Sequence, residues 1–150
     1  MKKVEIIILK TEEEYKSEYK KLYLNSGVFL IDIPVEFTES DFNHIFYEPG
    51  KEGSGYVFSE RRAKRMYFIK AILSGDFNIE IMYEIDRGTI VLFCLDLECV
   101  VYLRNRPGSG KLQVGTFFDF GRDHTKMYQK QKRKCEPITL SEIRKKYGIE

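Results

Sequence analysis

The sequence contains no tryptophan, two histidines, three cysteines and four prolines among its 150 residues. The odd number and wide spacing of Cys94, Cys99 and Cys135 fit neither a disulfide framework nor a zinc knuckle. We also expect no signal peptide, and no apolar run approaches the roughly 20 residues that span a bilayer. We therefore expect a reduced, cytoplasmic protein without a membrane segment, with Cys94 and Cys99 as small core residues.

The sequence has no paired carboxylates at a spacing that would hold a metal ion. The turn Gly108–Lys111 shares glycines and a lysine with phosphate-binding loops, but it lacks their full glycine spacing. A hairpin turn explains this segment better. We therefore expect no metal and no cofactor.

The net charge is only +2, but the charge is distributed unevenly. Residues 121–150 carry nine Lys or Arg against four Asp or Glu, a balance of +5, so residues 1–120 carry −3. A basic end on a mildly acidic body indicates an anionic partner on one surface. A solvated lysine-rich face would give the same pattern.

Hydrophobic periodicity predicts helices at both ends of the chain and strands between them. Thr11 followed by Glu14 is typical of a capping box, so a helix should begin there, and the apolar run 4–9 could be a strand before it. A second apolar run, 28–33, ends at Pro34. After residue 75 the period changes to 2, which predicts strands over 78–85, 89–95, 99–104 and 111–118.

The links between these four strands are short, so only antiparallel neighbours can be joined. Residues 122–134 then form a basic helix and residues 140–147 a terminal one. We predict a single α+β domain over 1–150, with N-terminal helices packed on a four-stranded antiparallel meander and a basic C-terminal helix.

The segment 59–73 reads as one helix with Ser59 as its N-cap. At about 100° per residue, Arg62 and Arg65 fall on the same stripe as the apolar residues Met66, Ile69, Ile72 and Leu73. A guanidinium keeps its charge and is costly to bury without a partner. Two interpretations stay open, namely a cleft that holds an anion, or internal pairing with carboxylates such as Asp32, Glu36 or Asp119.

Two further residues could carry chemistry. His44 precedes the glycine-rich loop 48–55, and a histidine near pKa 6.5 suits general acid–base catalysis, although a locally packed histidine is the commoner case. Thr116 should share the face of Leu112 and Val114, where its hydroxyl needs a backbone or ligand partner. Together with Arg62 and Arg65, these side chains describe a metal-free site for a phosphodiester.

The segments Asp41–Ile45, Val57–Ser59 and Arg61–Ile69, with the strand 111–118 and the basic helix after it, resemble a known family. They are similar to phage-associated members of the barnase–EndoU–colicin–RelE-like (BECR) nuclease superfamily, over roughly residues 40–133. The resemblance implies a metal-independent RNase or toxin-like activity. It matches His44, Arg62, Arg65 and Thr116 to the family's site residues, although Gly115 leaves the register of Thr116 open by one position. Arg61 and Lys64 stand at positions that are acidic in the family.

The leading hypothesis is a metal-independent endoribonuclease of phage or mobile-element origin. In it His44 is the acid or base, Arg62 and Arg65 clamp the phosphate, and Thr116 orients a phosphate oxygen. The flanking phosphates would be held at helical spacing by Arg122, Lys126, Lys130 and Arg133. RNA, including tRNA or another structured RNA, is the expected partner, and a proteinaceous inhibitor is a second one. The alternatives are a non-catalytic nucleic-acid-binding module and a protein-interaction or inhibitor domain.

Overall fold

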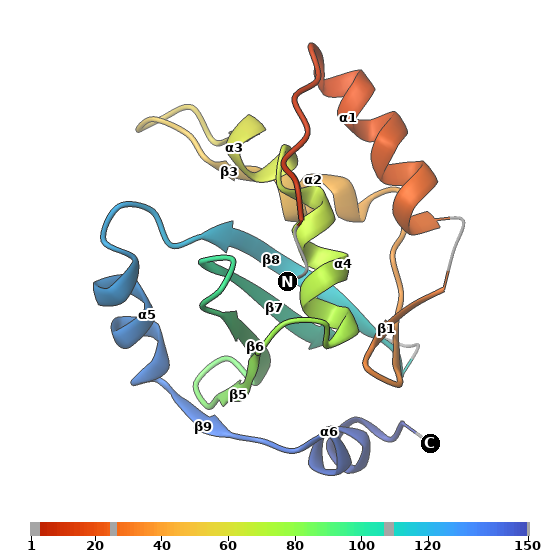
Figure 1. Cartoon of the computed structure of the whole chain (residues 1–150), viewed down its shortest axis with the longest axis vertical. Helices are drawn as coiled ribbons and strands as arrows, with labels where there is room; N and C mark the ends of the chain where they lie inside the picture. Colours follow the sequence, from red (N-terminus) through yellow and green to blue (C-terminus); the bar gives the residue numbers. More distant parts are fainter. Residues whose placement is uncertain (1–3, 25–26, 107–109, 150) are drawn as a thin grey trace.

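The computed structural model describes residues 4–24, 27–106 and 110–149 and shows a mixed α and β chain (Figure 1). Its central element is a seven-stranded sheet with the strand order β1-β2-β8-β7-β6-β5-β9. The four long strands are β5 (Glu80–Glu84), β6 (Thr89–Cys94), β7 (Cys99–Asn105) and β8 (Leu112–Asp119). They correspond to the four predicted strands and are antiparallel neighbours in chain order. The predicted four-stranded meander is nevertheless wrong in extent, because three short strands extend this sheet.

The additional strands lie at the two edges of the sheet. β9 (Cys135–Pro137) pairs with β5, while β1 (Val28–Leu30) pairs with β2 (Ile33–Val35). β2 also pairs with β8, in parallel, through Val35 and Leu112. The apolar run 28–33 is therefore not one segment that ends at Pro34, as the sequence suggested. The chain reverses direction at Ile31, and Pro34 lies inside β2. Ile31 has a φ of 58°, which a β-branched residue rarely adopts, and its N–H donates to the Leu73 carbonyl oxygen at 2.9 Å.

The N-terminal helix begins where the sequence predicts. The Thr11 hydroxyl accepts a hydrogen bond from the Glu14 N–H at 3.2 Å and caps α1 (Glu12–Tyr19), which continues into the π-helical turn η1 (Lys20–Leu24). The run 4–9 is not a strand. It is extended, and Ile7 N–H donates to the Lys64 carbonyl oxygen at 2.8 Å.

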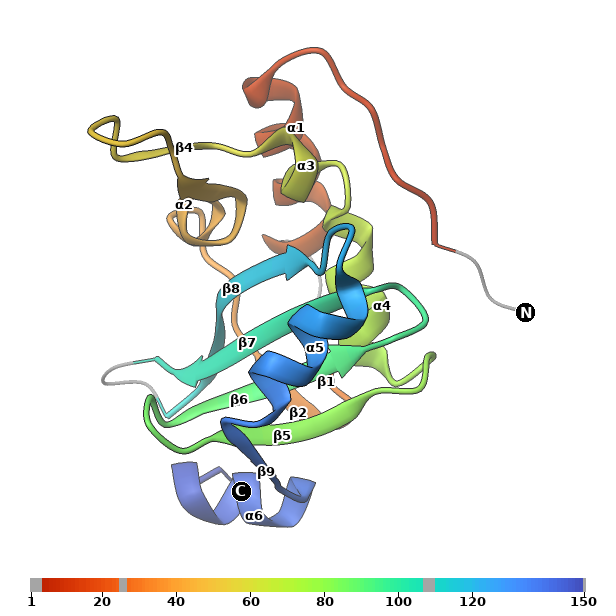
Figure 2. The same cartoon turned by 90° about the vertical axis from the view of Figure 1, so that its left-hand side faces the viewer.

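Helices cover both faces of the sheet (Figure 2). On one face α4 (Met66–Ser74) and the N-terminal helices build the main core, to which α6 (Leu140–Tyr147) adds Ile143. On the other face, α5 (His124–Lys132) packs through Met127 and Tyr128 on a smaller apolar cluster. Cys94 and Cys99 are buried core residues, as predicted.

The segment between β2 and α4 carries most of the predicted site residues. α2 (Asp41–Phe46) is followed by the hairpin of β3 (Tyr47–Pro49) and β4 (Tyr56–Phe58), and then by the short α3 (Glu60–Ala63). Residues 48–55, predicted as a loop, thus include the end of β3. In the part of the chain that the structure describes, no helix is long and apolar enough to cross a membrane.

Candidate functional site

The arginine segment is two helices, not one. Ser59 caps α3 by accepting a hydrogen bond from the Arg62 N–H at 3.2 Å, as predicted, but α3 ends at Ala63 and α4 begins only at Met66. Arg65 stands between them with φ −103° and ψ 19°, outside helical geometry. The single stripe expected for Arg62 and Arg65 is therefore wrong, because the break rotates one arginine relative to the other.

Arg62 lies under the start of the β3–β4 hairpin. Its Nη1 donates to the Tyr47 carbonyl oxygen at 2.8 Å, and its Nε lies 3.6 Å from a Glu48 carboxylate oxygen. The guanidinium also covers the Phe118 ring at 5.8 Å from the ring centroid. The side chain is only 14% exposed, and Nε has no hydrogen-bond partner among the described residues. Burial lowers the pKa of Arg62, while the charge of Glu48 acts in the opposite direction.

Arg65 has a different environment. Its Nη1 donates to the Arg61 carbonyl oxygen at 2.7 Å, at the protein surface. Arg61 in turn forms an ion pair with Asp119 at 2.5 Å. No described contact joins Arg62 to Arg65, and each guanidinium donates to a different backbone carbonyl group.

The carboxylates considered as internal partners of these arginines pair elsewhere. Asp32 lies 3.1 Å from Arg144, and Glu36 lies 2.6 Å from Arg106. Asp119 binds Arg61 rather than Arg62 or Arg65. Arg62 does form an ion pair with a carboxylate of the chain, but this carboxylate is Glu48, which was not among the predicted partners.

His44 is exposed on α2, whose buried side carries Phe42, Ile45 and Phe46. Among the residues that the structure describes, its imidazole has no hydrogen-bond or ion-pair partner, so it is not a locally satisfied core histidine. His44 lies three residues before Tyr47, the residue whose carbonyl binds Arg62. No described contact joins His44 directly to Arg62 or to Thr116.

Thr116 lies on the opposite face of the sheet from the one predicted. It pairs with Tyr102, whereas Val114 pairs with the next residue, Leu103, so Gly115 is the extra residue of a β-bulge. The bulge reverses the alternation along β8, and Leu112 and Val114 face the main core while Phe118 packs on the second face. Thr116 shares the face of Tyr102 and Phe118, because it directly opposes the former and precedes the latter by two residues.

The predicted site residues are thus only partly assembled. Arg62 and Thr116 both border Phe118, and the end of α2 that carries His44 meets Arg62 at Tyr47. Arg65 lies outside this group in the described contacts. In the described ranges, no group of three or more His, Cys, Asp or Glu side chains is placed to hold a metal ion.

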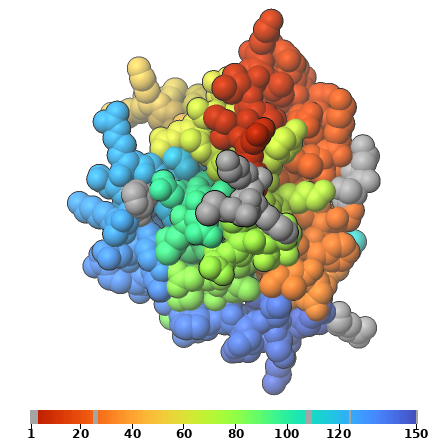
Figure 3. All heavy atoms as spheres, viewed as in Figure 1, coloured from red at the N-terminus to blue at the C-terminus, as the bar shows by residue number. Residues whose placement is uncertain are grey.

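The basic helix is shorter than the predicted 122–134, because α5 covers only His124–Lys132 and leaves Arg122 and Arg133 in the turns at its two ends. Its inward side is fixed by Tyr128, whose ring meets Phe93 edge-on at 5.3 Å, and by Gln131, which accepts a hydrogen bond from the Tyr102 hydroxyl at 3.1 Å. Four cations are exposed on α5 and at its two ends, namely Arg122, Lys126, Lys130 and Arg133. Among the described residues none of the four forms an ion pair, and Figure 3 shows the residues of α5 (light blue) at the surface.

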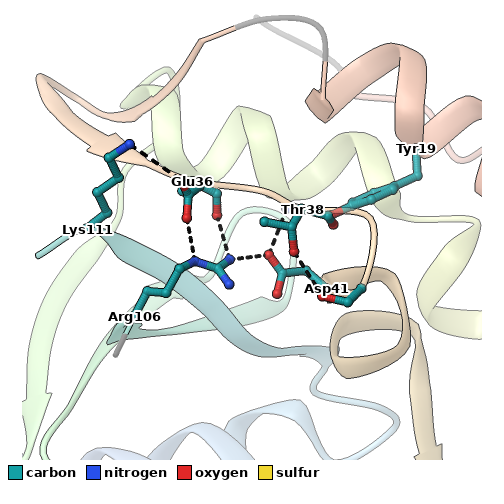
Figure 4. A network of polar contacts seen from close by, with 7 residues as sticks. Tyr19, Glu36, Thr38, Asp41, Arg106 and Lys111 are labelled. Atoms are coloured by element: carbon teal, nitrogen blue, oxygen red, sulfur yellow. Dashed lines mark hydrogen bonds and ion pairs between the residues drawn. The ribbon is translucent and has the colours of Figure 1, made fainter. Parts of the chain in front are cut away.

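One polar network was not foreseen from the sequence (Figure 4). Asp41 is 2% exposed and accepts hydrogen bonds from the Thr38 N–H at 2.9 Å and from Arg106 at 2.5 Å. Arg106 also reaches Glu36, and the Thr38 carbonyl accepts from the Tyr19 hydroxyl at 2.7 Å. Through Arg106, the network connects the N-terminus of α2 to the segment that follows β7. Its one sequence signal was the spacing of Thr38 and Asp41, a hydroxyl residue followed three positions later by an acid.

Comparison of the chain with protein-family models, with curated proteins and with solved structures gives no match.

Proposed function

We propose that this protein binds nucleic acid along α5, with single-stranded RNA as the expected ligand. The observation that carries the proposal is the set of four exposed cations on α5 and at its two ends, none of which has a carboxylate partner among the described residues. Several other basic side chains do pair with carboxylates, as Lys20 does with Glu39 at 2.8 Å and Arg61 with Asp119. Unpaired cations can neutralise phosphates and release their counterions.

The dimensions of α5 suit a phosphate backbone. At 1.5 Å per residue, its nine residues extend about 13 Å. One strand of a duplex carries a phosphate about every 3.4 Å, so this length can meet several phosphates. A helix fixed by Tyr128 and Gln131 presents these cations on a rigid support, which reduces the entropy lost on binding.

An exposed aromatic residue favours a single strand over a duplex. Tyr56 on β4 is 73% exposed and pairs with Pro49 of β3, the strand whose Tyr47 carbonyl binds Arg62. Unpaired bases stack on such rings, whereas bases inside a duplex do not expose their faces.

The test is fluorescence anisotropy with a labelled 20-nucleotide RNA over a series of KCl concentrations. The double variant Lys126→Glu/Lys130→Glu should weaken binding at least tenfold and reduce the slope of log K against log salt by about two. The matched control is Lys21→Glu/Lys145→Glu, which reverses two exposed lysines away from α5 and gives the same net charge. Equal losses in both variants would show a general charge effect and contradict binding along α5.

A second candidate function is RNA cleavage without a metal ion, and a specific observation favours it. Arg62 touches the C-terminal end of α2 at Tyr47 and the Phe118 ring, so the segments carrying His44 and Thr116 meet at one guanidinium. In the proposed reaction His44 removes the proton of a ribose 2′-hydroxyl, whose oxygen attacks the adjacent phosphorus. The bond from phosphorus to the 5′-oxygen breaks, that oxygen takes a proton from a water molecule, and the resulting hydroxide takes back the proton held by His44. A 2′,3′-cyclic phosphate remains.

Cleavage is tested on a denaturing gel with end-labelled RNA in the presence of EDTA. His44→Ala should abolish the product while the circular dichroism spectrum stays unchanged, and Asn43→Ala, at the exposed neighbouring position, is the matched control. Product formation by the His44→Ala variant at the wild-type rate would contradict the catalytic assignment. Salt-dependent binding without product would leave RNA binding as the function.

A further inference from the structure

The second face of the sheet is only partly covered by α5. The contact between the Tyr102 hydroxyl and Gln131 marks where α5 reaches β7. The Tyr102 ring then stacks on Phe118 at 5.9 Å. Because side chains alternate along a strand, the next residue of β7 on this face is Arg104, which is exposed.

The bulge at Gly115 puts Thr116 on the same face of the sheet as Arg104. Thr116 lies opposite Tyr102 and Gln113 lies opposite Arg104, with Gly115 as the extra residue between them. A Cβ atom at Gly115 would lie 3.6 Å from Cδ and 3.8 Å from Cγ of Arg104. The stem of Arg104 therefore lies against the bulge, on the face of the sheet that also carries Thr116.

The guanidinium of Arg104 has no internal function in the described contacts. It forms no hydrogen bond or ion pair with any residue in the described ranges, unlike Arg61, Arg62 and Arg106. Glu84, a buried carboxylate on the neighbouring strand pair, is already engaged. It accepts from the Thr89 hydroxyl at 3.1 Å and lies 3.9 Å from Arg87.

We propose that Arg104 and Thr116 form a subsite for one backbone phosphate of the bound nucleic acid, next to α5. A guanidinium donates two parallel N–H bonds to a phosphate, and a threonine hydroxyl can donate a third. Exposed surface arginines usually have freely moving stems, but this stem is supported along the glycine bulge, so less rotamer freedom is lost on binding. The inference rests on the proposed RNA binding. It extends the RNA-binding surface from α5 to the part of the sheet that α5 does not cover.

The experiment uses the full chain and a fluorescein-labelled single-stranded 12-nucleotide RNA, again over a KCl series. Arg104→Ala should weaken binding about fivefold and reduce the salt slope by about one, as expected for one lost phosphate contact. Arg104→Lys should keep the slope but recover only part of the affinity, because an ammonium group cannot bind a phosphate bidentately. Thr116→Val, which keeps the shape without the hydroxyl, should lower the affinity and leave the slope unchanged.

Arg87→Ala is the matched control, because Arg87 is 77% exposed but lies beside Glu84. It should bind RNA like the wild type. If Arg104→Ala binds with the wild-type affinity and slope while Lys126→Glu/Lys130→Glu is weakened, the subsite is overturned and binding along α5 stands. If the wild-type protein shows no salt-dependent binding, both proposals are overturned. Circular dichroism and thermal melts of each variant exclude unfolding as the cause of a loss.

Discussion

Arg62 closes the C-terminal end of α2 by donating from Nη1 to the carbonyl oxygen of Tyr47 at 2.8 Å. The same guanidinium packs on Phe118 of β8 and faces Glu48 of β3. One side chain thus connects the helix that carries His44, the β3–β4 hairpin and the strand that carries Thr116. A cation is also favourable at this end of a helix, where the carbonyl groups lack intrahelical partners.

Arg62→Ala should destabilise the protein by about 1–3 kcal/mol, because the Tyr47 carbonyl and Glu48 lose their partner in a partly buried place. The measurement is urea unfolding followed by circular dichroism. Arg65→Ala is the comparison and should cost less, since the one hydrogen bond of its guanidinium to a described residue goes to the Arg61 carbonyl at the surface. Equal stability of the Arg62→Ala variant and the wild type would contradict a connecting function for Arg62.

Asp41→Ala should destabilise the protein by about 3 kcal/mol, because it removes a buried carboxylate from Arg106 and from the Thr38 N–H. Chemical unfolding measures this loss. Asn43→Ala, at an exposed position of the same helix, should change the free energy of unfolding by no more than about 0.5 kcal/mol. A loss of similar size in both variants would indicate a general effect on α2 rather than the network of Asp41.

Glu80 should make the stability of the protein depend on pH in the acidic range. Burial raises the pKa of this carboxyl, but hydrogen bonds from Lys132 at 2.8 Å and from Tyr128 outweigh burial, and the net pKa is lowered from 4.5. A lowered folded-state pKa gives stability that is present above the unfolded value and is lost as pH falls through the folded value. The wild type should therefore exceed Glu80→Gln in stability above about pH 4.5, and the difference should shrink below it.

Urea unfolding of the wild type and Glu80→Gln between pH 3 and pH 7 measures this difference. Its size should stay below about 1 kcal/mol, because Lys132 and Glu80 are 41% and 36% exposed and the pair is screened by solvent. A difference that grows as the pH falls would contradict the assigned sign.

The parts of the fold that depend on long periodic segments could be predicted from the sequence. The alternation over 78–118 and the short links specify β5 to β8, and Thr11 specifies the start of α1. The short edge strands β1, β2 and β9 could not be predicted, because three residues carry no measurable period and their partners are distant in the chain. The turn at Ile31 could not be predicted either, because a β-branched residue rarely has a positive φ. The hydrogen bond from the Ile31 N–H to the Leu73 carbonyl is a tertiary contact that the local sequence does not reveal.

The candidate site was predicted in composition but not in geometry. Periodicity placed Arg62 and Arg65 on one stripe, and one break after Ala63 separates them. Likewise, the single extra residue Gly115 moves Thr116 to the other face of the sheet, because strand alternation has a period of two. Arg104 was not predicted as a site residue at all, since only the bulge reveals that it shares a face of the sheet with Thr116.

Tyr56 provides a direct optical test of whether the ligand is single-stranded. The chain contains no tryptophan, so Tyr56→Trp introduces a single indole at a position that is 73% exposed. Stacking of a base on this ring should quench its fluorescence, and the titration should give the same Kd as anisotropy. Tyr56→Ala should weaken binding about tenfold, because a base stacked on an aromatic ring contributes about 1–3 kcal/mol.

Phe29→Trp is the control, because Phe29 is 47% exposed on β1, which lies across the molecule from the β3–β4 hairpin in Figure 1. Its fluorescence should not change with RNA. A duplex of the same sequence should bind with less quenching at Tyr56→Trp, since its bases are already stacked on one another. If RNA binds but quenches the indoles at positions 56 and 29 equally, the ligand does not stack on the hairpin, and the cations of α5 alone account for its affinity.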